Sequence, residues 1–426
     1  MATGEAKLEA IVRQAITAFQ PKIAVRLWTG ERIGPADGPA LALNDPAAIA
    51  RLAIRPTIAT AVELWMAKAV DIEDGTIFDV AAARSDIRTK DALKKLDKLR
   101  IAAALPPLYV LARKGAKDAK AAPQAGDGAG ASGSSMAAIQ FHYDISNDFY
   151  RLFLDERMLY SCAYFDGWHD DIDKAQRDKL EMICRKLRLK PGERLLDIGC
   201  GWGALLIHAA ENYGVTGHGV TLSQAQYDLA RERVAAKGLG DRVTIELKPF
   251  QEVSGAFDKI ASIGMFEHVG WAHHDAYFSA VRKLLRPNGL YLHHAITRPA
   301  KATDKAFRKG TKEYAAIIRY IFPGAELDHV GHSAQKLETH RFEVHDVENW
   351  REHYGRTCRL WHDRLSANME EASRIAGEPR ARLWLLYLAG VSLGFSRGGL
   401  LIYQTLASRR AKGPAELPPT RRDLYF

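Results

Sequence analysis

The first hundred residues alternate between helical and strand-like patterns of apolar positions. The spacing predicts a helix whose buried face carries Leu8, Ile11, Val12, Ile16 and Phe19. Alternation over residues 22–34 predicts a strand and a hairpin, and Asp45-Pro46 is typical of a helix start. Residues 58–78 predict another helix that ends near a turn, so residues 1–110 are expected to form a small α+β domain.

The C-terminal part of the chain holds the longest apolar runs. The stretch 383–395 has thirteen uncharged residues, too few to span a bilayer, and predicts a buried helix. Segments around 305–320 and 383–405 are expected to be helices that either line an acyl-chain tunnel or complete a core. The basic and aromatic residues of 417–426 predict a surface or subunit contact.

A change in composition divides the chain into two domains. Residues 114–136 are rich in Gly, Ala, Ser and Lys and predict a flexible linker between a domain at 1–113 and a catalytic domain at 137–426. Within the first domain, residues 86–100 form a basic amphipathic pattern. It predicts a helix that faces either solvent or a phospholipid surface.

Charge and cysteine usage narrow the possible partners and compartments. The chain has 60 Lys and Arg against 51 Asp and Glu, a net charge of +9, which fits an anionic partner such as phospholipid or nucleic acid. Its four cysteines form no C-x-x-C pair, so neither a zinc nor a redox motif is present, no metal is expected, and a reducing cytoplasm is favoured. The N-terminal residues contain Glu5 and Glu9 and no apolar run, so they do not resemble a signal peptide.

A glycine-rich loop between a strand and a helix is the strongest local signal for a cofactor site. The buried run 195–198 precedes Gly199-Cys200-Gly201, where glycines let the backbone approach a ligand closely. This looks like the first β-α-β unit of a class I S-adenosylmethionine methyltransferase. A dinucleotide fold would place Asp or Glu after the second strand, and Thr221 begins a run there without one.

Six motifs in order resemble the cyclopropane-fatty-acyl-phospholipid synthase family, which includes mycolic acid methyltransferases. They are HYDISNDFYRLFLDERMLYSCAYF, VTLSQAQ, GMFEHVG, YIFPGAEL, DVENWREHYGRT and GFSRGG. The resemblance is close over 137–426 and looser before it. It implies an α/β class I methyltransferase fold, Rossmann-like, with a seven-stranded mostly parallel sheet and helices on both faces. The small N-terminal α+β domain resembles lipid-binding modules.

The resemblance also implies the reaction and its cofactors. Family members add the methyl carbon of S-adenosylmethionine across a cis double bond of a phospholipid acyl chain, with bicarbonate as the base. The implied catalytic residues are Cys162, Glu267, His294, Ile296 through its backbone, and Tyr320. The implied cofactor-binding residues are Tyr160, Ser161, Asp197, Gly199, Gly201, Thr221, Leu222, Gln226, Phe250 and Gln251.

Several of these residues have structural alternatives. Glu267 would instead cap a helix, with His268 as the functional residue. A strand would point His293 and His294 to opposite faces, and the family pattern favours His294 as the inward one. Cys162 and Tyr320 would pack in a core. The residues expected to shape the lid over the cofactor pocket are His142, Tyr143, Asn147 and Asp148.

The expected function is cyclopropanation of phospholipid acyl chains. The enzyme is expected to be cytoplasmic and to associate peripherally with the inner face of the membrane. A homodimer is a possible assembly. The same methyl transfer could end in a methylene-branched or methylated unsaturated chain. Nucleic-acid methylation is disfavoured because no basic stretch with interleaved aromatics follows the glycine loop. A non-catalytic lipid-transfer protein is disfavoured by the intact loop and Glu267.

Overall fold

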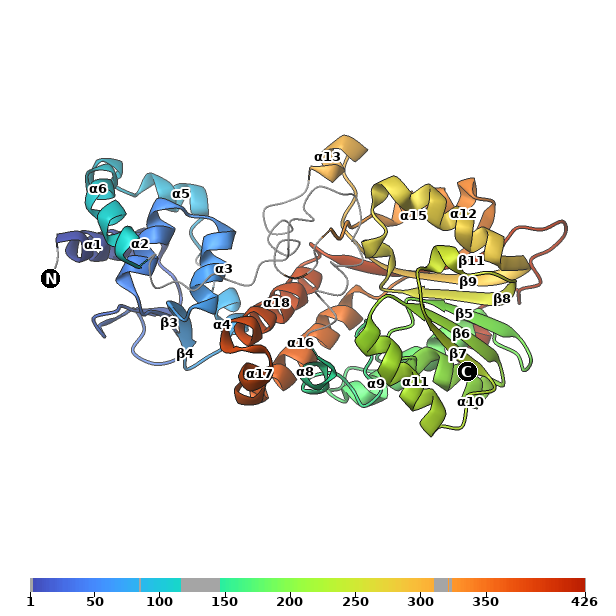
Figure 1. The fold of residues 1–426 in the computed structure, drawn as a ribbon. Coiled ribbons are helices and arrows are strands. Elements are labelled where there is room, and N and C mark those ends of the chain that lie inside the picture. Colours follow the sequence, from blue (N-terminus) through green and yellow to red (C-terminus); the bar gives the residue numbers. More distant parts are fainter. Residues whose placement is uncertain (1–2, 84–85, 116–145, 310–320, 322–323, 426) are drawn as a thin grey trace. The chain divides into compact units, whose positions relative to one another are not determined.

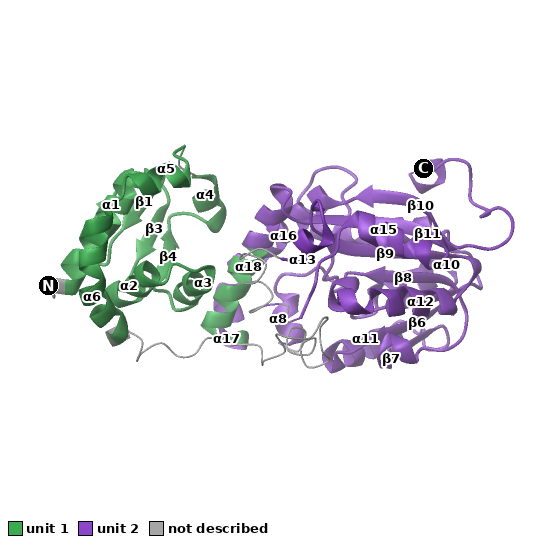
Figure 2. Cartoon of the chain, turned by 90° about the horizontal axis from the view of Figure 1, so that it is seen from above, with its two compact units in different colours: residues 1–124, 376–389 green, residues 125–375, 390–426 purple. Residues whose placement is uncertain are grey.

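The chain forms two compact units in the computed structural model. The structure describes residues 3–83, 86–115, 146–309, 321 and 324–425 (Figure 1). One unit comprises residues 1–124 and 376–389, and the other comprises residues 125–375 and 390–426 (Figure 2). Most of the predicted linker lies outside the described residues, as do Tyr320, His142 and Tyr143.

The first unit is an α+β arrangement around a four-stranded sheet of order β2-β1-β3-β4. Its elements are α1 (Thr3–Phe19), β1 (Ala24–Arg26), β2 (Arg32–Ile33), β3 (Ala40–Leu43), α2 (Pro46–Ile54), α3 (Ile58–Met66), β4 (Val70–Glu73), α4 (Ile77–Ala82), α5 (Thr89–Lys94) and α6 (Lys98–Gly115). The predicted N-terminal helix and hairpin are confirmed, with Val25 paired to Ile33. Asp45 caps α2 by accepting the Ala47 amide at 2.8 Å, as its sequence predicts.

Two helix predictions in this unit need correction. The basic pattern at 86–100 forms two helices because the Asp97 carboxylate accepts the amides of Leu99 and Arg100 and thereby starts α6. The pattern at 58–78 contains strand β4, which pairs with β3 before the turn. Helical spacing alone did not separate these elements.

The segment 376–389 belongs to the first unit, although its sequence position placed it in the second domain. The Arg382 guanidinium lies 4.2 Å from the Trp65 ring centre and donates to the Trp65 carbonyl at 2.7 Å. The Trp65 indole in turn donates to the Arg382 carbonyl at 2.8 Å, and Arg382 pairs with Asp71 at 3.1 Å. Cation–π and ionic contacts therefore hold this segment in the first unit.

The second unit is built around a seven-stranded sheet of order β10-β11-β9-β8-β5-β6-β7. Strands β9, β8, β5, β6 and β7 run parallel, while β11 is antiparallel to both of its neighbours. The strands are β5 (Arg194–Ile198), β6 (Thr216–Thr221), β7 (Val243–Leu247), β8 (Phe257–Ile263), β9 (Leu285–Thr297), β10 (Phe342–Asn349) and β11 (Leu401–Arg409). The predicted mostly parallel, seven-stranded sheet is confirmed.

Helices cover both faces of this sheet (Figure 1). The described helices after residue 146 are α8 (Asn147–Arg151), α9 (Ile172–Leu187), α10 (Ala204–Tyr213), α11 (Gln224–Ala236), α12 (His274–Leu284), α13 (Asp304–Arg308), α15 (Val330–Thr339), α16 (Arg351–Ala367), α17 (Met369–Ala376) and α18 (Glu378–Ser396), with short 3-10 turns η1 (Phe250–Glu252), η2 (Phe266–His268), η3 (Trp271–His273) and η4 (Arg422–Leu424). The residues of α18 up to 389 belong to the first unit. Successive residues of β5 point to opposite faces. Leu195 packs with residues of α9 and α10, and Leu196 packs with residues of α12.

The predicted C-terminal helix is only partly correct. Residues 383–396 are helical in α18, but 401–405 lie in β11, which pairs with β9 (Ile402 opposite Ile296). Strand pairing therefore overrides an apolar run that is compatible with either structure. Among the described helices, none is long and apolar enough to cross a membrane.

Candidate active site

A cavity of about 580 Å³ opens where the parallel strands of the second unit end. Its walls come from the segments that follow β5, β6, β7 and β8, together with residues 158–161 and one side of α9. Ligands of open α/β sheets bind at this carboxyl edge because the connecting loops diverge there. The cavity is therefore the candidate site for the cofactor.

All ten residues predicted to bind S-adenosylmethionine line this one cavity. They are Tyr160, Ser161, Asp197, Gly199, Gly201, Thr221, Leu222, Gln226, Phe250 and Gln251. Their individual contacts with the cofactor stay predictions. Thr221 donates to the Gln226 side chain at 2.7 Å, and both residues are buried, so the polar groups at this end are held in place.

The two predicted glycines are required for different reasons. Gly201 has a φ of +54°, and a Cβ built there meets no protein atom within 4 Å, so it faces open space at the cavity wall. Gly199 has a φ of +81°, and its Cβ would lie 2.9 Å from the Met265 side chain. The sequence argument attributed both glycines to the cofactor; at Gly199 packing against Met265 is a second constraint.

A buried lysine that sequence reasoning missed lies at the same wall. Lys179 of α9 is 1% exposed, lines the cavity and donates to the Ser161 hydroxyl at 2.7 Å. Burial lowers the pKa of Lys179 to about 8 and raises the pKa of Asp197 to about 7, although the lysine charge opposes the latter shift. The sequence signal that could have identified Lys179 is its position on the apolar face of the amphipathic helix α9.

The aromatic stretch after the linker builds one wall of the cavity. The ring of Tyr150 lies 5.3 Å from that of Trp202 and 5.5 Å from that of Tyr160, and Tyr160 lies 5.3 Å from Trp361. Asn147 accepts the Trp202 indole N–H at 2.8 Å, which joins α8 to the glycine-rich loop. Asp148, in contrast, is exposed and pairs with Arg151.

Glu267 and Ile296, two of the predicted catalytic residues, are in direct contact. The Ile296 amide donates to Glu267 Oε1 at 2.6 Å, so the carboxylate binds a strand amide and does not cap a helix. Burial raises the pKa of Glu267 to about 7, although the Ile296 amide opposes that shift. Glu267 Oε2 is buried and has no hydrogen-bond partner among the described residues.

The adjacent histidines point to opposite faces of β9, as the strand alternation predicts. His293 accepts or donates a 3.0 Å hydrogen bond with the Tyr291 hydroxyl and lies edge-on to Phe266. His294 contacts the Gln404 amide at 3.0 Å, while its Nε2 is buried without a partner in the described part of the chain. Since Ile296 is two residues along, His294 and Ile296 face the same side.

Cys162 and His294 both contact Trp350. The Cys162 thiol lies 3.7 Å from the Trp350 carbonyl, and the Trp350 ring lies 5.4 Å edge-on to His294. Burial raises the pKa of Cys162 well above its ordinary value, so the thiol stays protonated. Cys162 and Glu267 are each next in the chain to a cavity-lining residue, Ser161 and His268 respectively, and do not line the cavity themselves.

His268, the alternative functional residue, lines the cavity itself, and burial lowers its pKa to about 4. The structure therefore brings Glu267 to Ile296 and brings Cys162 and His294 to Trp350. The catalytic roles of these residues stay predictions.

Comparisons with known proteins agree with this architecture. The profile of the mycolic acid cyclopropane synthetase family matches residues 131–405. A probable fatty acid methyltransferase of Pseudomonas putida is 42% identical over 292 residues, which are 68% of this chain and 73% of that protein. The cyclopropane-fatty-acyl-phospholipid synthase of Escherichia coli (strain K12) is 40% identical over 268 residues, 63% of this chain and 66% of that protein.

A solved structure supports the same conclusion. The crystal structure of mycolic acid cyclopropane synthase CmaA1 complexed with SAH and CTAB is 34% identical, has a TM-score of 0.60, and covers 65% of this chain and 99% of its own. The match to the E. coli protein spans about two thirds of that protein's length, and the family match does not include residues 1–130. The predicted class I fold and the family resemblance are confirmed: the chain belongs to the mycolic acid cyclopropane synthetase family of S-adenosylmethionine-dependent methyltransferases.

Proposed function

We propose that this enzyme transfers the methyl carbon of S-adenosylmethionine to a cis double bond in an unsaturated phospholipid acyl chain and forms a cyclopropane ring. The observation that carries the proposal is that Glu267 Oε2 and His294 Nε2 are both buried and unpartnered among the described residues. Glu267 precedes the cavity-lining residue His268 in the chain, and His294 pairs on β9 with the cavity-lining residue Ile263 of β8. A buried polar atom without a partner requires an explanation, such as a catalytic role, a bound water or a bound ion.

The reaction makes demands that these residues meet. An alkene is a weak nucleophile, so it must be held close to the sulfonium in a site without competing water. Methyl transfer produces a carbocation, which the aromatic rings of the cavity-lining residues Tyr160 and Trp202 would stabilise. A proton must then leave the new methyl group, and Glu267, with a pKa of about 7, is suited to accept or relay one near neutral pH.

Bicarbonate is the small anion that we propose as the ligand of Glu267 and His294, and it would supply the base for ring closure. The donor set fits such an anion in part, since the His294 ring nitrogen and Glu267 Oε2 are both unpartnered. The Ile296 amide already donates to Glu267 Oε1, so Oε2 is the oxygen that would accept the bicarbonate hydroxyl or share a proton with the anion. Glu267 would orient the anion, and Tyr320 would be a further donor.

A second product has specific support. The relative from Pseudomonas putida is named a probable fatty acid methyltransferase, which favours a methylene-branched or methylated unsaturated chain as the alternative product. The position of the base relative to the cation decides between ring and branch. Expression in a host that lacks the activity, followed by proton NMR of its lipids, separates the two. Upfield cyclopropane protons are expected; olefinic and branched-methyl signals alone would establish the alternative, and unmodified lipids would contradict both.

The opposite orientation of the two histidines gives a matched pair of variants. We expect His294→Ala to lower turnover by about 10–100-fold because its buried ring nitrogens are lost, with little change in S-adenosylmethionine affinity. His293→Ala removes a hydrogen bond to Tyr291 on the other face and should lower thermal stability but leave kcat within about threefold. Steady-state kinetics on folded protein measures both. The reverse ranking would contradict the proposed role of His294.

The first unit offers a surface for membrane association, which we propose as the route to phospholipid substrates. On α6, Leu99 is 85% exposed and Val110 is 60% exposed. Lys95 and Arg100 line a cleft of about 400 Å³ beside α1. Exposed apolar and basic groups together favour an anionic lipid surface.

Charge reversal of this surface should weaken vesicle binding. We expect the Lys95→Glu/Arg100→Glu variant to bind anionic vesicles at least roughly 30-fold less tightly, because each lost basic residue is worth about 1 kcal/mol and the added carboxylates are repelled. Lys283→Glu/Lys412→Glu makes the same charge change at exposed positions of the second unit and serves as the control. Vesicle co-sedimentation at two salt concentrations provides the measurement. Equal losses in both variants would mean that net charge, not this surface, drives binding.

A further inference from the structure

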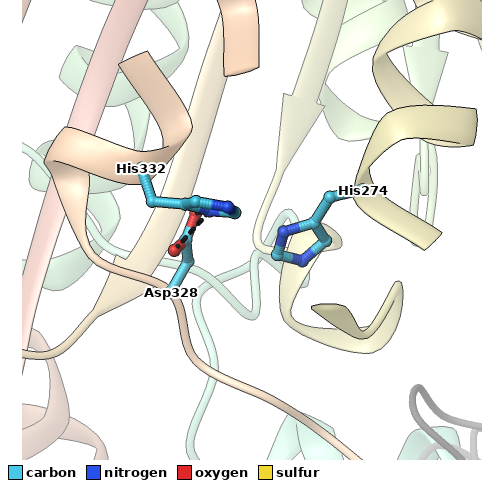
Figure 3. Close-up of side chains that lie close together, drawn as sticks. All are labelled: His274, Asp328 and His332. Atoms are coloured by element: carbon cyan, nitrogen blue, oxygen red, sulfur yellow. Dashed lines mark hydrogen bonds and ion pairs between the residues drawn. The ribbon is translucent and has the colours of Figure 1, made fainter. Parts of the chain in front are cut away.

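Three side chains with metal-binding groups meet away from the cofactor cavity. His274 is the first residue of α12, His332 lies in the first turn of α15, and Asp328 precedes that helix (Figure 3). One donor atom from each residue lies within 4.8 Å of the others. His274 is 0% exposed, Asp328 is 1% and His332 is 9%, so the group is enclosed.

The imidazole of His274 is the unexplained member of this group. Both of its ring nitrogens are buried and lack a hydrogen-bond partner among the described residues. Its ring faces Asp328 and His332 in Figure 3, with 5.5 Å between the ring centres of the two histidines. Burying an imidazole without a hydrogen bond to either nitrogen costs the desolvation free energy of both atoms. A bound ligand would offset this cost.

Asp328 and His332 are already arranged as neighbouring ligands. His332 Nδ1 and Asp328 Oδ1 are 2.9 Å apart in a hydrogen-bonded pair, so both donor atoms face the same point and a metal ion would replace the proton between them. The Ser333 hydroxyl donates to Asp328 Oδ2 at 2.7 Å, and the His329 amide donates to Oδ1 at 2.7 Å. Such outer hydrogen bonds orient ligating carboxylates in metal sites.

Other clusters of these residue types in the described chain hold a protein cation. Between Asp166 and Asp178, beside His169, the Lys174 ammonium lies 2.7 Å from one carboxylate and 2.6 Å from the other. Similarly, Asp275 pairs with both His340 and Lys336. These sites are neutralised without a metal, and they are less buried than the group around His274.

We propose that His274, Asp328 and His332 bind one divalent transition-metal cation of the zinc or iron(II) type. Two imidazoles and a carboxylate suit these ions and suit Mg²⁺ or Ca²⁺ poorly, since the latter prefer oxygen ligands. With three protein ligands, water completes the coordination. The site has no cysteine, so the absence of C-x-x-C pairs, which led us to expect no metal, does not bear on it.

The cation would join α12 to α15. It would thereby stabilise the contacts of Trp271 and Glu326, which connect these helices to Glu267. Trp271, next to His274 in the fold, donates its amide to Glu326, whose own amide donates to the Glu267 carbonyl at 2.8 Å. The ring of Trp271 stacks on His332 with 4.2 Å between centres. We assign the cation a stabilising role for this segment, and the assignment does not depend on the proposed acyl-chain chemistry.

The test uses the full chain after chelator dialysis, with Zn²⁺ as the probe. We expect one equivalent of zinc per chain by elemental analysis and a rise in Tm of roughly 3–8 °C at zinc concentrations near a hundred times Kd. Asp328→Asn and His274→Gln should each lose the bound zinc and the Tm rise. His340→Gln, which alters the neighbouring His–Asp pair, should keep both.

If a variant fails to fold, the absorption spectrum of the wild-type chain with Co²⁺ in place of Zn²⁺ still tests the site. Ligand-field absorption without a thiolate charge-transfer band is expected, because no cysteine belongs to the site. Wild-type protein that retains no zinc and shows no Tm change would overturn the proposal, as would an Asp328→Asn variant that binds zinc as tightly as wild type. A buried water would then be the partner of His274.

Discussion

Replacing Glu267 by glutamine is expected to lower turnover by about 10²–10⁴-fold, the usual contribution of a group that transfers or positions a proton. The affinity for S-adenosylmethionine should change less than about threefold, because Glu267 is not among the residues that line the cofactor cavity. Glutamine keeps the carbonyl oxygen that accepts the Ile296 amide, so the local fold should survive. Single-turnover kinetics with calorimetric titration of the cofactor separates the two effects.

The same substitution should raise stability at high pH. The folded pKa of Glu267, about 7, lies above its ordinary value of 4.5, so the native state holds its proton more tightly than the unfolded state does. Wild-type stability therefore falls, relative to the glutamine variant, as pH rises from about 4.5 to 7. The difference should reach at most about 3 kcal/mol above pH 7 and vanish below pH 4. Denaturant unfolding at pH 4 and pH 8 provides the measurement.

Glu252→Gln is the control for both experiments because Glu252 is exposed and lies on η1. It should change neither kcat nor the pH dependence of stability by a measurable amount. Turnover of wild type should also fall in carbonate-depleted buffer and recover with added bicarbonate. If it does not respond while Glu267→Gln is inactive, Glu267 itself takes the proton. Full activity of Glu267→Gln would contradict both forms of the proposal.

Gly201→Val should weaken S-adenosylmethionine binding by roughly 100-fold or more, since overpacking a ligand site by a few heavy atoms costs about 3 kcal/mol. The Cβ at this position meets no protein atom within 4 Å, so the valine side chain would occupy space at the cavity wall. Its φ of +54° adds backbone strain, which lowers stability as well. Calorimetry on folded protein measures the affinity.

The Gly192→Val variant distinguishes the effect of backbone strain from the effect of steric blockage of the cofactor cavity. Gly192 also has a positive φ, +82°, and open space around its Cβ, but it does not line the cavity. Both variants should lose similar stability, and only Gly201→Val should lose the cofactor. Near-wild-type affinity in a folded Gly201→Val protein would place the cofactor elsewhere, and equal loss in both variants would show that backbone strain is the cause.

The cofactor half of the site was predictable because its signals are local. A buried strand, a glycine loop and a helix occur within a few residues of one another, and the positive φ of Gly201 is a property of that loop. Residues elsewhere in the chain then followed from family motifs. Alternation along β9 likewise sufficed to place His293 and His294 on opposite faces.

By itself, then, the sequence determined the family, the parallel sheet and the residues around the cofactor cavity. Only the tertiary structure decided that 401–405 pair as a strand with β9, that Lys179 is buried at the cavity wall, and that the Ile296 amide satisfies Glu267. It alone brought His274 to Asp328 and His332. The physical reason is that periodicity reports which face of an element is apolar, whereas contacts between distant segments depend on which strands pair and which helices pack on them.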